Sequence, residues 1–349
     1  MYKNQELFLC SRSARQQHRT VFRMILSDFE LLMLALGAMG FGTVMLVYGG
    51  NWTIDGAVYT ARKFGVSSLL IGFTVIAFGT SLPELLVSVN ANLKGYAGIS
   101  LGNVLGSNIA NVLLVVGTAA LLTTIQVAWK PIRNDIFMML FATALMIVAF
   151  LSGVVTPWMG IGFVGVLVAY VIYTYSIALR GEPVNIEEPD EPEFQSDWMA
   201  YLFLVLGLIL VAAGAEFLVR GAKISAEILG VPDAVIALSL IAIGTSLPEL
   251  ATCIAAVMKK NTDIIIGNIV GSNVFNILMI IGVTATIKEI PVAEQAPELV
   301  RFDMWITLAV TLFFAAWLAA FKRVPRPLGG IFLLAYASYM LLIYNYNTI

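Results

Sequence analysis

The chain contains one stretch of sequence twice, at a fixed separation of 165 residues. Residues 76–117 read IAFGTSLPELLVSVNANLKGYAGISLGNVLGSNIANVLLVVG, and residues 241–282 align with them without a gap as IAIGTSLPELATCIAAVMKKNTDIIIGNIVGSNVFNILMIIG. Identical residues fill 20 of the 42 positions. They include Pro, Glu and Asn, which two unrelated apolar segments would not share in register. The chain is therefore an internal duplication, and its fold has to accommodate two copies of one unit.

Both copies lie in a chain that has the composition of a membrane protein. Hydrophobic residues make up 59% of the 349 residues, charged residues make up 12%, and the mean hydropathy is +0.89. A soluble domain carries about twice that share of charge. A spanning helix needs about 20 mostly apolar residues, and ten stretches meet this requirement. We expect spans near residues 29–50, 66–92, 98–122, 134–152, 157–179, 199–220, 233–258, 264–287, 302–321 and 327–346.

Ten spans shared between two copies give five spans per copy. Because five is odd, the second copy has to cross the membrane in the opposite sense to the first. We therefore expect an all-α polytopic membrane protein of ten transmembrane helices, arranged as two inverted-topology five-helix repeats with broken helices at the centre, as in many secondary transporters. The expected divisions are a polar basic segment (1–28), the first repeat (29–179), an acidic proline-containing linker (180–198) and the second repeat (199–349).

Residues 1–28 allow two interpretations. The segment lacks the short apolar region and cleavage site of a signal peptide, so it is either a cytoplasmic tail or an untranslated stretch before a start at Met24. Loops after the odd-numbered spans carry twice as many Lys and Arg as loops after the even-numbered ones. Basic residues favour the cytoplasmic side. If residues 1–28 are left out, the N-terminus is therefore expected outside the cell. If they are included, their own Lys and Arg make the numbers of basic residues on the two sides equal, and the orientation stays open. In both cases we expect a multi-pass protein of the cell membrane.

The stretch GTSLPE, at residues 79–84 and again at 244–249, contains residues that a membrane helix normally avoids. One interpretation is a capping box, in which the serine and the glutamate bond to backbone N–H groups at a helix start. Glu84 and Glu249, however, each lie ten residues before a lysine near the end of a span, which is about 15 Å along a helix and near mid-bilayer. A carboxylate at that depth indicates a functional site, and a helix that starts there implies a break beside a cavity.

The second half of each repeated stretch adds further side chains with oxygen atoms. Within GNVLGSNIAN and GNIVGSNVFN these are Ser107, Asn108, Asn111, Ser272, Asn273 and Asn276. In each copy the serine and the last asparagine are four residues apart and share a helix face. Hard cations such as Ca²⁺ take about six to eight oxygen ligands. No Lys or Arg is close in sequence to the two glutamates, so their charge matches one Ca²⁺ or a pair of Na⁺.

The duplicated GTSLPE and GNxxGSN motifs resemble the α-repeats of the cation/Ca²⁺ exchanger superfamily, most closely those of the prokaryotic Na⁺/Ca²⁺ exchangers. The resemblance covers nearly all of residues 29–346. It implies alternating access at a central site, helices 1 and 6 that slide over the other eight, and Na⁺ moving down its gradient to drive Ca²⁺ the other way. It also implies that Glu84 and Glu249 bind the two ions in turn. Further ligands implied by the resemblance are Thr80, Ser81, Thr245, Ser246, Ser107, Ser272, Asn111, Asn276 and, through carbonyl oxygens, Ala77 and Ala242.

Two departures from the family pattern bear on the ions. Family members often carry Asp at one of the positions held here by Asn111 and Asn276, which leaves the ion stoichiometry open. The H⁺/Ca²⁺ branch typically has GNxxE where this chain has GNVLG and GNIVG, which favours Na⁺. An H⁺-coupled Ca²⁺ or Mn²⁺ antiporter of the same superfamily stays as the alternative. Inverted halves suit alternating access better than a channel, and an intramembrane protease would need a catalytic His or paired Asp within the spans.

The remaining composition restricts other chemistry. The one histidine, His18, lies in the polar N-terminal segment, as does Cys10, while Cys253 lies in a predicted span. We therefore expect no haem, zinc site or disulfide. The net charge of −2 provides no basic surface for nucleic acid. We expect a secondary transporter rather than an enzyme, without a cofactor, whose partners are Ca²⁺, Na⁺ and the lipid bilayer. The sequence does not indicate an oligomeric state.

Overall fold

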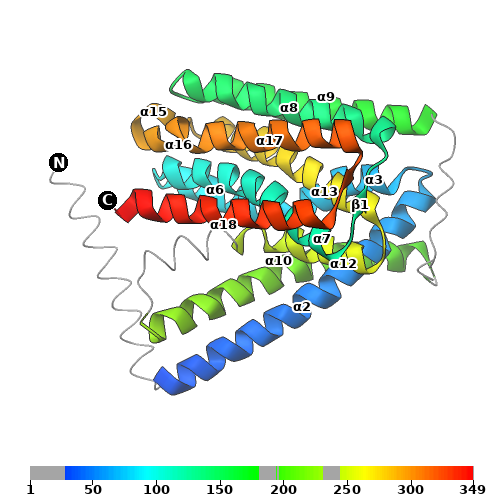
Figure 1. The fold of residues 1–349 in the computed structure, drawn as a ribbon, viewed down its shortest axis with the longest axis horizontal. Helices are drawn as coiled ribbons and strands as arrows, with labels where there is room; N and C mark the ends of the chain where they lie inside the picture. The colour runs from blue at the N-terminus through cyan, green and yellow to red at the C-terminus, as the bar shows by residue number, and fades with distance from the viewer. Residues whose placement is uncertain (1–27, 181–193, 195, 231–243, 349) are drawn as a thin grey trace.

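The computed structural model describes residues 28–180, 194, 196–230 and 244–348 (Figure 1). Within these residues, eight helices are long and apolar enough to cross a membrane, and a ninth span arises if two helices that meet at 42° are counted as one. The prediction of an all-α polytopic protein is therefore confirmed. The number ten stays a prediction, because residues 231–243, in the first part of the seventh expected span, lie outside the described residues. The expectations for residues 1–27 and for most of the acidic linker lie outside them too.

The helices follow the expected spans with local irregularities. Three of the spans that the structure describes contain a π-helical segment, a feature that is often found at functional sites. The uninterrupted spans are α2 (Asp28–Lys63), α8 (Trp129–Leu151), α9 (Pro157–Arg180), α10 (Asp197–Ile228), α17 (Asp303–Phe321) and α18 (Arg326–Thr348). The spans with a π segment are α3–η1–α4 (Ser68–Ile71, Gly72–Ile76, Ala77–Thr80), α6–η2–α7 (Ala97–Ala110, Asn111–Val116, Gly117–Leu122) and α13–η3–α14 (Thr262–Phe275, Asn276–Ile281, Gly282–Ile287).

Shorter elements complete the described chain. Helix α5 (Leu82–Leu93) continues the first bent span, and α12 (Leu247–Met258) is the second part of the seventh expected span. Two short helices, α15 (Val292–Gln295) and α16 (Pro297–Arg301), precede α17. The strands β1 (Ile125–Gln126) and β2 (Arg323–Val324) pair antiparallel and join the loop after α7 to the loop after α17. Segments from both halves of the sequence are thus bound to each other outside the spans as well as inside them.

Helices α2 and α10 pack as a close antiparallel pair along one side of the molecule (Figure 1). A Cβ atom on Gly42 would lie 2.6 Å from the carbonyl oxygen of Gly214, and one on Gly56 would lie 2.7 Å from that of Ala200. The seam repeats every seven residues along each helix, and contacts this short leave no room for a side chain. The glycines of the seam are Gly42, Gly49 and Gly56 on α2 and Gly207, Gly214 and Gly221 on α10.

The first span is longer than predicted. We expected it near residues 29–50, because polar residues follow, but α2 continues to Lys63. The hydroxyls of Thr53 and Thr60 donate hydrogen bonds to the carbonyl oxygens of Gly49 and Gly56, at 2.8 Å and 2.6 Å. These polar groups are thereby satisfied within the helix, so a drop in hydropathy does not mark the helix end here.

Helices α13 and α14 form the centre of the molecule. Every residue in the most apolar stretch of this span is buried. A Cβ atom on Gly267 would lie 2.4 Å from the carbonyl oxygen of Leu69, and one on Gly271 would lie 2.3 Å from that of Phe73. The glycines of the second copy thus let α13 contact the backbone of α3 and η1 directly, which fixes the first half of the bent span against the core.

The outer helices form two hairpins, and in each a tyrosine hydroxyl makes a part-buried hydrogen bond to an aspartate. In the α8–α9 hairpin the hydroxyl of Tyr170 donates to Asp135 Oδ1 at 2.6 Å. In the α17–α18 hairpin the hydroxyl of Tyr339 donates to Asp303 Oδ1, also at 2.6 Å. The sequence alone did not predict these pairs. Each satisfies a carboxylate inside a spanning segment, where an unpaired polar group would be costly.

Candidate ion-binding site

The predicted break in the first GTSLPE span is present. Helix α4 ends at Thr80, α5 begins at Leu82, and the two meet at Ser81 with a bend of 42°. Pro83 is tolerated in the first turn of α5, but because it has no N–H, the carbonyl of Gly79 lacks its usual helical donor. In the second copy, the turn before α12 is described from residue 244 onward, and the helix expected upstream of it lies outside the described residues.

The capping-box interpretation of GTSLPE is wrong. Ser81 and Ser246 occupy the N-cap positions of α5 and α12, but neither side chain caps its helix. Within the two GTSLPE motifs, six side-chain oxygen atoms are instead buried without a hydrogen-bond partner among the described residues: the two hydroxyl oxygens of these serines and all four carboxylate oxygens of Glu84 and Glu249. Buried oxygens are normally satisfied by a donor or a cation, so this arrangement fits cation coordination.

The two glutamates belong to one site. Both side chains are fully buried, and Glu84 lies close enough to Glu249 to interact with it electrostatically. The hydroxyls of Thr80 and Ser272 lie beside the carboxylate of Glu249. Thr80 comes from the first copy and Glu249 from the second, so the two copies meet at this point. Two carboxylates in a dry interior are stable only when a bound cation or bound protons neutralise them.

The expected serine and threonine ligands are divided between the two copies in the same way. The Oγ atom of Ser107, on α6, lies 3.4 Å from the Oγ1 atom of Thr245, in the turn before α12. Ser272, on α13, donates to Asn268 Oδ1 at 3.4 Å. The serine of α6 thus reaches the turn before α12 of the other copy, whereas the hydrogen bond of Ser272 stays within α13.

Two alanine carbonyl oxygens were expected to bind ions, and only that of Ala77 belongs to a residue that the structure describes. The carbonyl oxygen of Ala77 accepts the backbone N–H of Ser81 at 3.1 Å and the hydroxyl of Thr80 at 3.4 Å. These two donors use both of its lone pairs, so Ala77 could bind an ion only after Thr80 rotates away. Ala242, its counterpart in the second copy, lies outside the described residues.

Four asparagines form crossed pairs at the centre, which the sequence alone did not predict. Asn111 Nδ2 donates to Asn273 Oδ1 at 3.1 Å, and Asn276 Nδ2 donates to Asn108 Oδ1 at 3.1 Å. The sequence suggested that all four side chains supply oxygens to a cation. The structure corrects this for Asn108 and Asn273, whose oxygens accept from the other copy. The Oδ1 atoms of Asn111 and Asn276 are buried without a donor among the described residues.

A second pair of asparagines supports the helices that carry the glutamates. Asn103 Nδ2, on α6, donates to the carbonyl oxygen of Glu84 at 3.2 Å and to Ser88 Oγ at 2.9 Å. In the other copy, Asn268 Nδ2 donates to Thr252 Oγ1 at 3.1 Å. Asn103 and Asn268 are the asparagines of the two GN dipeptides. Their equivalent positions in the two copies are the sequence feature from which a shared structural role could have been predicted.

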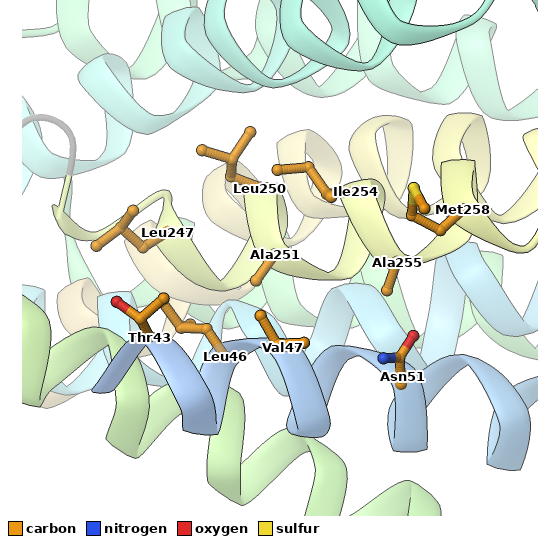
Figure 2. Close-up of a pocket in the computed structure, with 10 residues that line it drawn as sticks. All are labelled: Thr43, Leu46, Val47, Asn51, Leu247, Leu250, Ala251, Ile254, Ala255 and Met258. Carbon is orange, nitrogen blue, oxygen red and sulfur yellow. The ribbon is translucent and has the colours of Figure 1, made fainter. Parts of the chain in front are cut away.

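An apolar groove of about 190 Å³ lies between α2 and α12 (Figure 2). Its walls include Leu46 and Val47 on α2 and Ala251 on α12. Beyond the groove, Lys259 Nζ lies 2.6 Å from Asp55 Oδ1. Contact between α2 and the helix of the second glutamate is therefore incomplete, and one ion pair joins them at the end of α12.

Comparisons with known proteins show the family to which the chain belongs. The family model described as sodium/calcium exchanger protein matches residues 34–176 and again residues 199–345. The chain is 34% identical over 311 residues to CaxA of Alkalimonas amylolytica, covering 87% of this chain and 97% of that one. It is 30% identical over 361 residues to the sodium/calcium exchanger MaX1 of Methanosarcina acetivorans, covering 92% and 99%.

A solved structure is also similar to this chain. The sodium-calcium exchanger NCX_Mj, in crystals soaked with Na⁺ and Sr²⁺, superimposes with a TM-score of 0.76 at 32% identity, covering 89% of this chain and 98% of that one. The matches extend over both copies of the duplication and over almost the full length of these proteins. The chain therefore belongs to the sodium/calcium exchanger family, in the prokaryotic branch of the cation/Ca²⁺ exchanger superfamily.

Proposed function

We propose that this protein is a Na⁺/Ca²⁺ antiporter of the cell membrane, which binds the two ions alternately at a site shared by Glu84 and Glu249. Membership of the family makes it a cation/Ca²⁺ exchange transporter. The observation that carries the finer proposal is the set of buried carboxylate and serine oxygens that lack hydrogen-bond donors among the described residues. Oxygen ligands of this kind suit hard cations, and two carboxylates balance one Ca²⁺ or two Na⁺.

Coupling follows from the cost of an empty site. Two uncompensated carboxylates in a low-dielectric interior carry a large desolvation penalty. The protein therefore changes face with Ca²⁺ or Na⁺ bound, and the empty form does so rarely. Exchange rather than leak is the result, because each ion has to be replaced by the other before the site can return.

We further propose that the two repeats have inverted topology and that the α2–α10 pair is the moving element. The glycine seam keeps α2 and α10 together, whereas the groove leaves the contact between α2 and α12 incomplete, with one ion pair between Asp55 and Lys259 at the end of α12. Helix α10 also contacts both GTSLPE turns. A Cβ atom on Gly79 would lie 2.6 Å from Leu208 Cδ1, and one on Gly244 would lie 2.7 Å from Val219 Cγ2. Sliding of the pair would therefore change the cover over both turns at once.

The driving ion is tested in proteoliposomes loaded with Na⁺ and diluted into Na⁺-free buffer that contains ⁴⁵Ca²⁺. We expect an outward Na⁺ gradient to drive Ca²⁺ uptake and a pH gradient alone to drive none. Uptake driven by the pH gradient and not by Na⁺ would identify an H⁺-coupled antiporter, which the unpaired carboxylates would also permit, since they can bind a proton. If neither gradient moves Ca²⁺, the proposal is wrong, and the same vesicles test Mn²⁺.

A further inference from the structure

The crossed asparagines form a buried polar network between the two copies. Asn108 and Asn273 are 3% and 1% exposed, and Asn111 and Asn276 are fully buried. Each hydrogen bond joins one copy to the other, from the first residue of a π segment to the helix that precedes the opposite π segment. The network thus lies at the contact between α6–η2 and α13–η3.

These two hydrogen bonds use the nitrogen atoms of the Asn111 and Asn276 side chains and leave their oxygen atoms without a donor among the described residues. An asparagine side chain binds a cation only through its oxygen, because its nitrogen carries two donor hydrogens. If Asn111 were turned by 180°, its oxygen would face the oxygen of Asn273, and its NH₂ group would take the place of the free oxygen. The acceptor on Asn273 excludes this arrangement, and the acceptor on Asn108 does the same for Asn276.

The two acceptors are themselves held. Asn108 Nδ2 donates to the backbone oxygen of Asn273 at 3.5 Å, and Asn273 Nδ2 donates to Met139 Sδ on α8 at 3.7 Å. Because both NH₂ groups are used in this way, each Oδ1 faces the asparagine of the other copy. Thioether sulfur is a weak acceptor, so other packing around Asn273 has to contribute more to its orientation.

We propose that Asn108 and Asn273 are positioning residues for cation binding, each of which fixes the amide of a ligand asparagine in the other repeat with its oxygen toward the ion. This inference rests on the proposed function, because it takes Asn111 and Asn276 as ion ligands. The orientation of each ligand thereby depends on the opposite repeat, so the two halves of the site form together. It also explains how a chain with asparagine at both positions presents oxygen rather than NH₂ to a cation.

The test compares isosteric variants at Asn273 in Na⁺-driven Ca²⁺ uptake. Asn273→Leu removes the acceptor, whereas Asn273→Asp keeps an acceptor oxygen in the same place. Partners that orient metal ligands typically account for about 10- to 100-fold in affinity, so we expect the Leu variant to raise the KM for Ca²⁺ by at least about tenfold with little change in kcat. The Asp variant should stay within about threefold of the wild type.

A purely structural role predicts the opposite order. Asn273→Asp would then be at least as harmful as Asn273→Leu, because it buries a charge, and that result would overturn the inference. Asn108→Leu tests the equivalent bond in the other repeat, so a failure of one variant to fold still leaves a measurement. The matched control is Asn92→Leu, a buried asparagine that donates to the backbone oxygen of Lys288 at 2.8 Å, which should lower the Tm and leave the KM unchanged.

Failure of the inference differs from failure of the proposed function. If the wild type takes up Ca²⁺, Glu84→Gln is inactive and both leucine variants keep a normal KM, only the positioning role is wrong. If the wild type does not take up Ca²⁺ under a Na⁺ gradient, the proposed function is wrong. In that case ⁴⁵Ca²⁺ binding to the purified variants still tests the positioning role, and unchanged binding in both leucine variants would overturn it.

Discussion

The hydroxyl oxygens of Ser107 and Thr245 lie 3.4 Å apart, although 138 residues separate them in the sequence. Ser107 is carried by α6 of the first copy and Thr245 by the turn before α12 of the second. The contact brings the two repeated motifs together, with one residue from each copy.

The first prediction concerns this pair. If both hydroxyls contribute to one ion site, Ser107→Ala and Thr245→Val should each raise the KM for Ca²⁺. The loss of binding free energy in the double variant should then be smaller than the sum of the losses in the two single variants. Residues in one network are typically coupled by about 0.5–3 kcal/mol. A double-mutant cycle on Ca²⁺ uptake measures the coupling. Strictly additive effects would mean that the two hydroxyls act at separate places.

The second prediction concerns the α2–α10 seam. A Cβ atom on Gly49 would lie 2.9 Å from the carbonyl oxygen of Gly207, so Gly49→Ala should force the helices apart and lower stability by about 1–3 kcal/mol. Gly40→Ala is the matched control on the same helix, since nothing among the described residues lies within 4 Å of its Cβ position. Thermal unfolding in detergent compares the two. Equal Tm values would contradict a backbone-to-backbone seam.

The third prediction concerns movement of the pair against α12. A Cβ atom on Gly50 would lie 3.2 Å from the Cβ of Ala255, which is near the separation of about 3.5–4.5 Å in disulfides. The double variant Gly50→Cys with Ala255→Cys should cross-link under oxidation and stop exchange, and a reductant should restore it. Each single cysteine variant serves as the control against the native Cys253. Full exchange by the cross-linked protein would show that α2 does not move relative to α12.

The fourth prediction concerns the outer hairpins. Tyr170→Phe and Tyr339→Phe each remove a part-buried hydrogen bond of 2.6 Å to a carboxylate. Each should cost about 1–3 kcal/mol, read as a lower Tm, while the KM for Ca²⁺ stays unchanged because neither tyrosine contacts the ion site. Tyr173→Phe, on the exposed side of α9, should have no effect on stability. A shift in the KM without a loss of stability would assign the hairpins a role in binding.

Much of the fold could be predicted because the duplicated sequence and the apolar spans carry it directly. GTSLPE could be assigned to a break in a helix at mid-bilayer, since an uninterrupted membrane helix rarely carries proline and glutamate together at that depth. Helix ends were harder to predict. The first span was expected to end near residue 50, but threonines that bond to their own helix let α2 continue to Lys63.

The sequence could name candidate site residues, but it could not predict the hydrogen bonds that they make. Sequence spacing puts Ser107 and Asn111 on one face of a helix, but it does not reveal which atoms of the other copy they meet. For that reason Asn108 and Asn273 were expected to supply oxygens to the ion, whereas their oxygens accept hydrogen bonds across the repeat interface. Contacts between the copies depend on packing, such as Gly271 against Phe73, which no local pattern encodes.

The central claim is that Glu84 and Glu249 form one shared site, and equilibrium binding of ⁴⁵Ca²⁺ to the purified protein tests it most directly. Glu84→Gln and Glu249→Gln are compared with Glu216→Gln, which alters an exposed glutamate paired with Arg220 on α10. We expect one Ca²⁺ per chain in the wild type and in Glu216→Gln, and no measurable binding in either of the other two variants. Retention of half the bound Ca²⁺ by each variant would show two independent sites and contradict the claim.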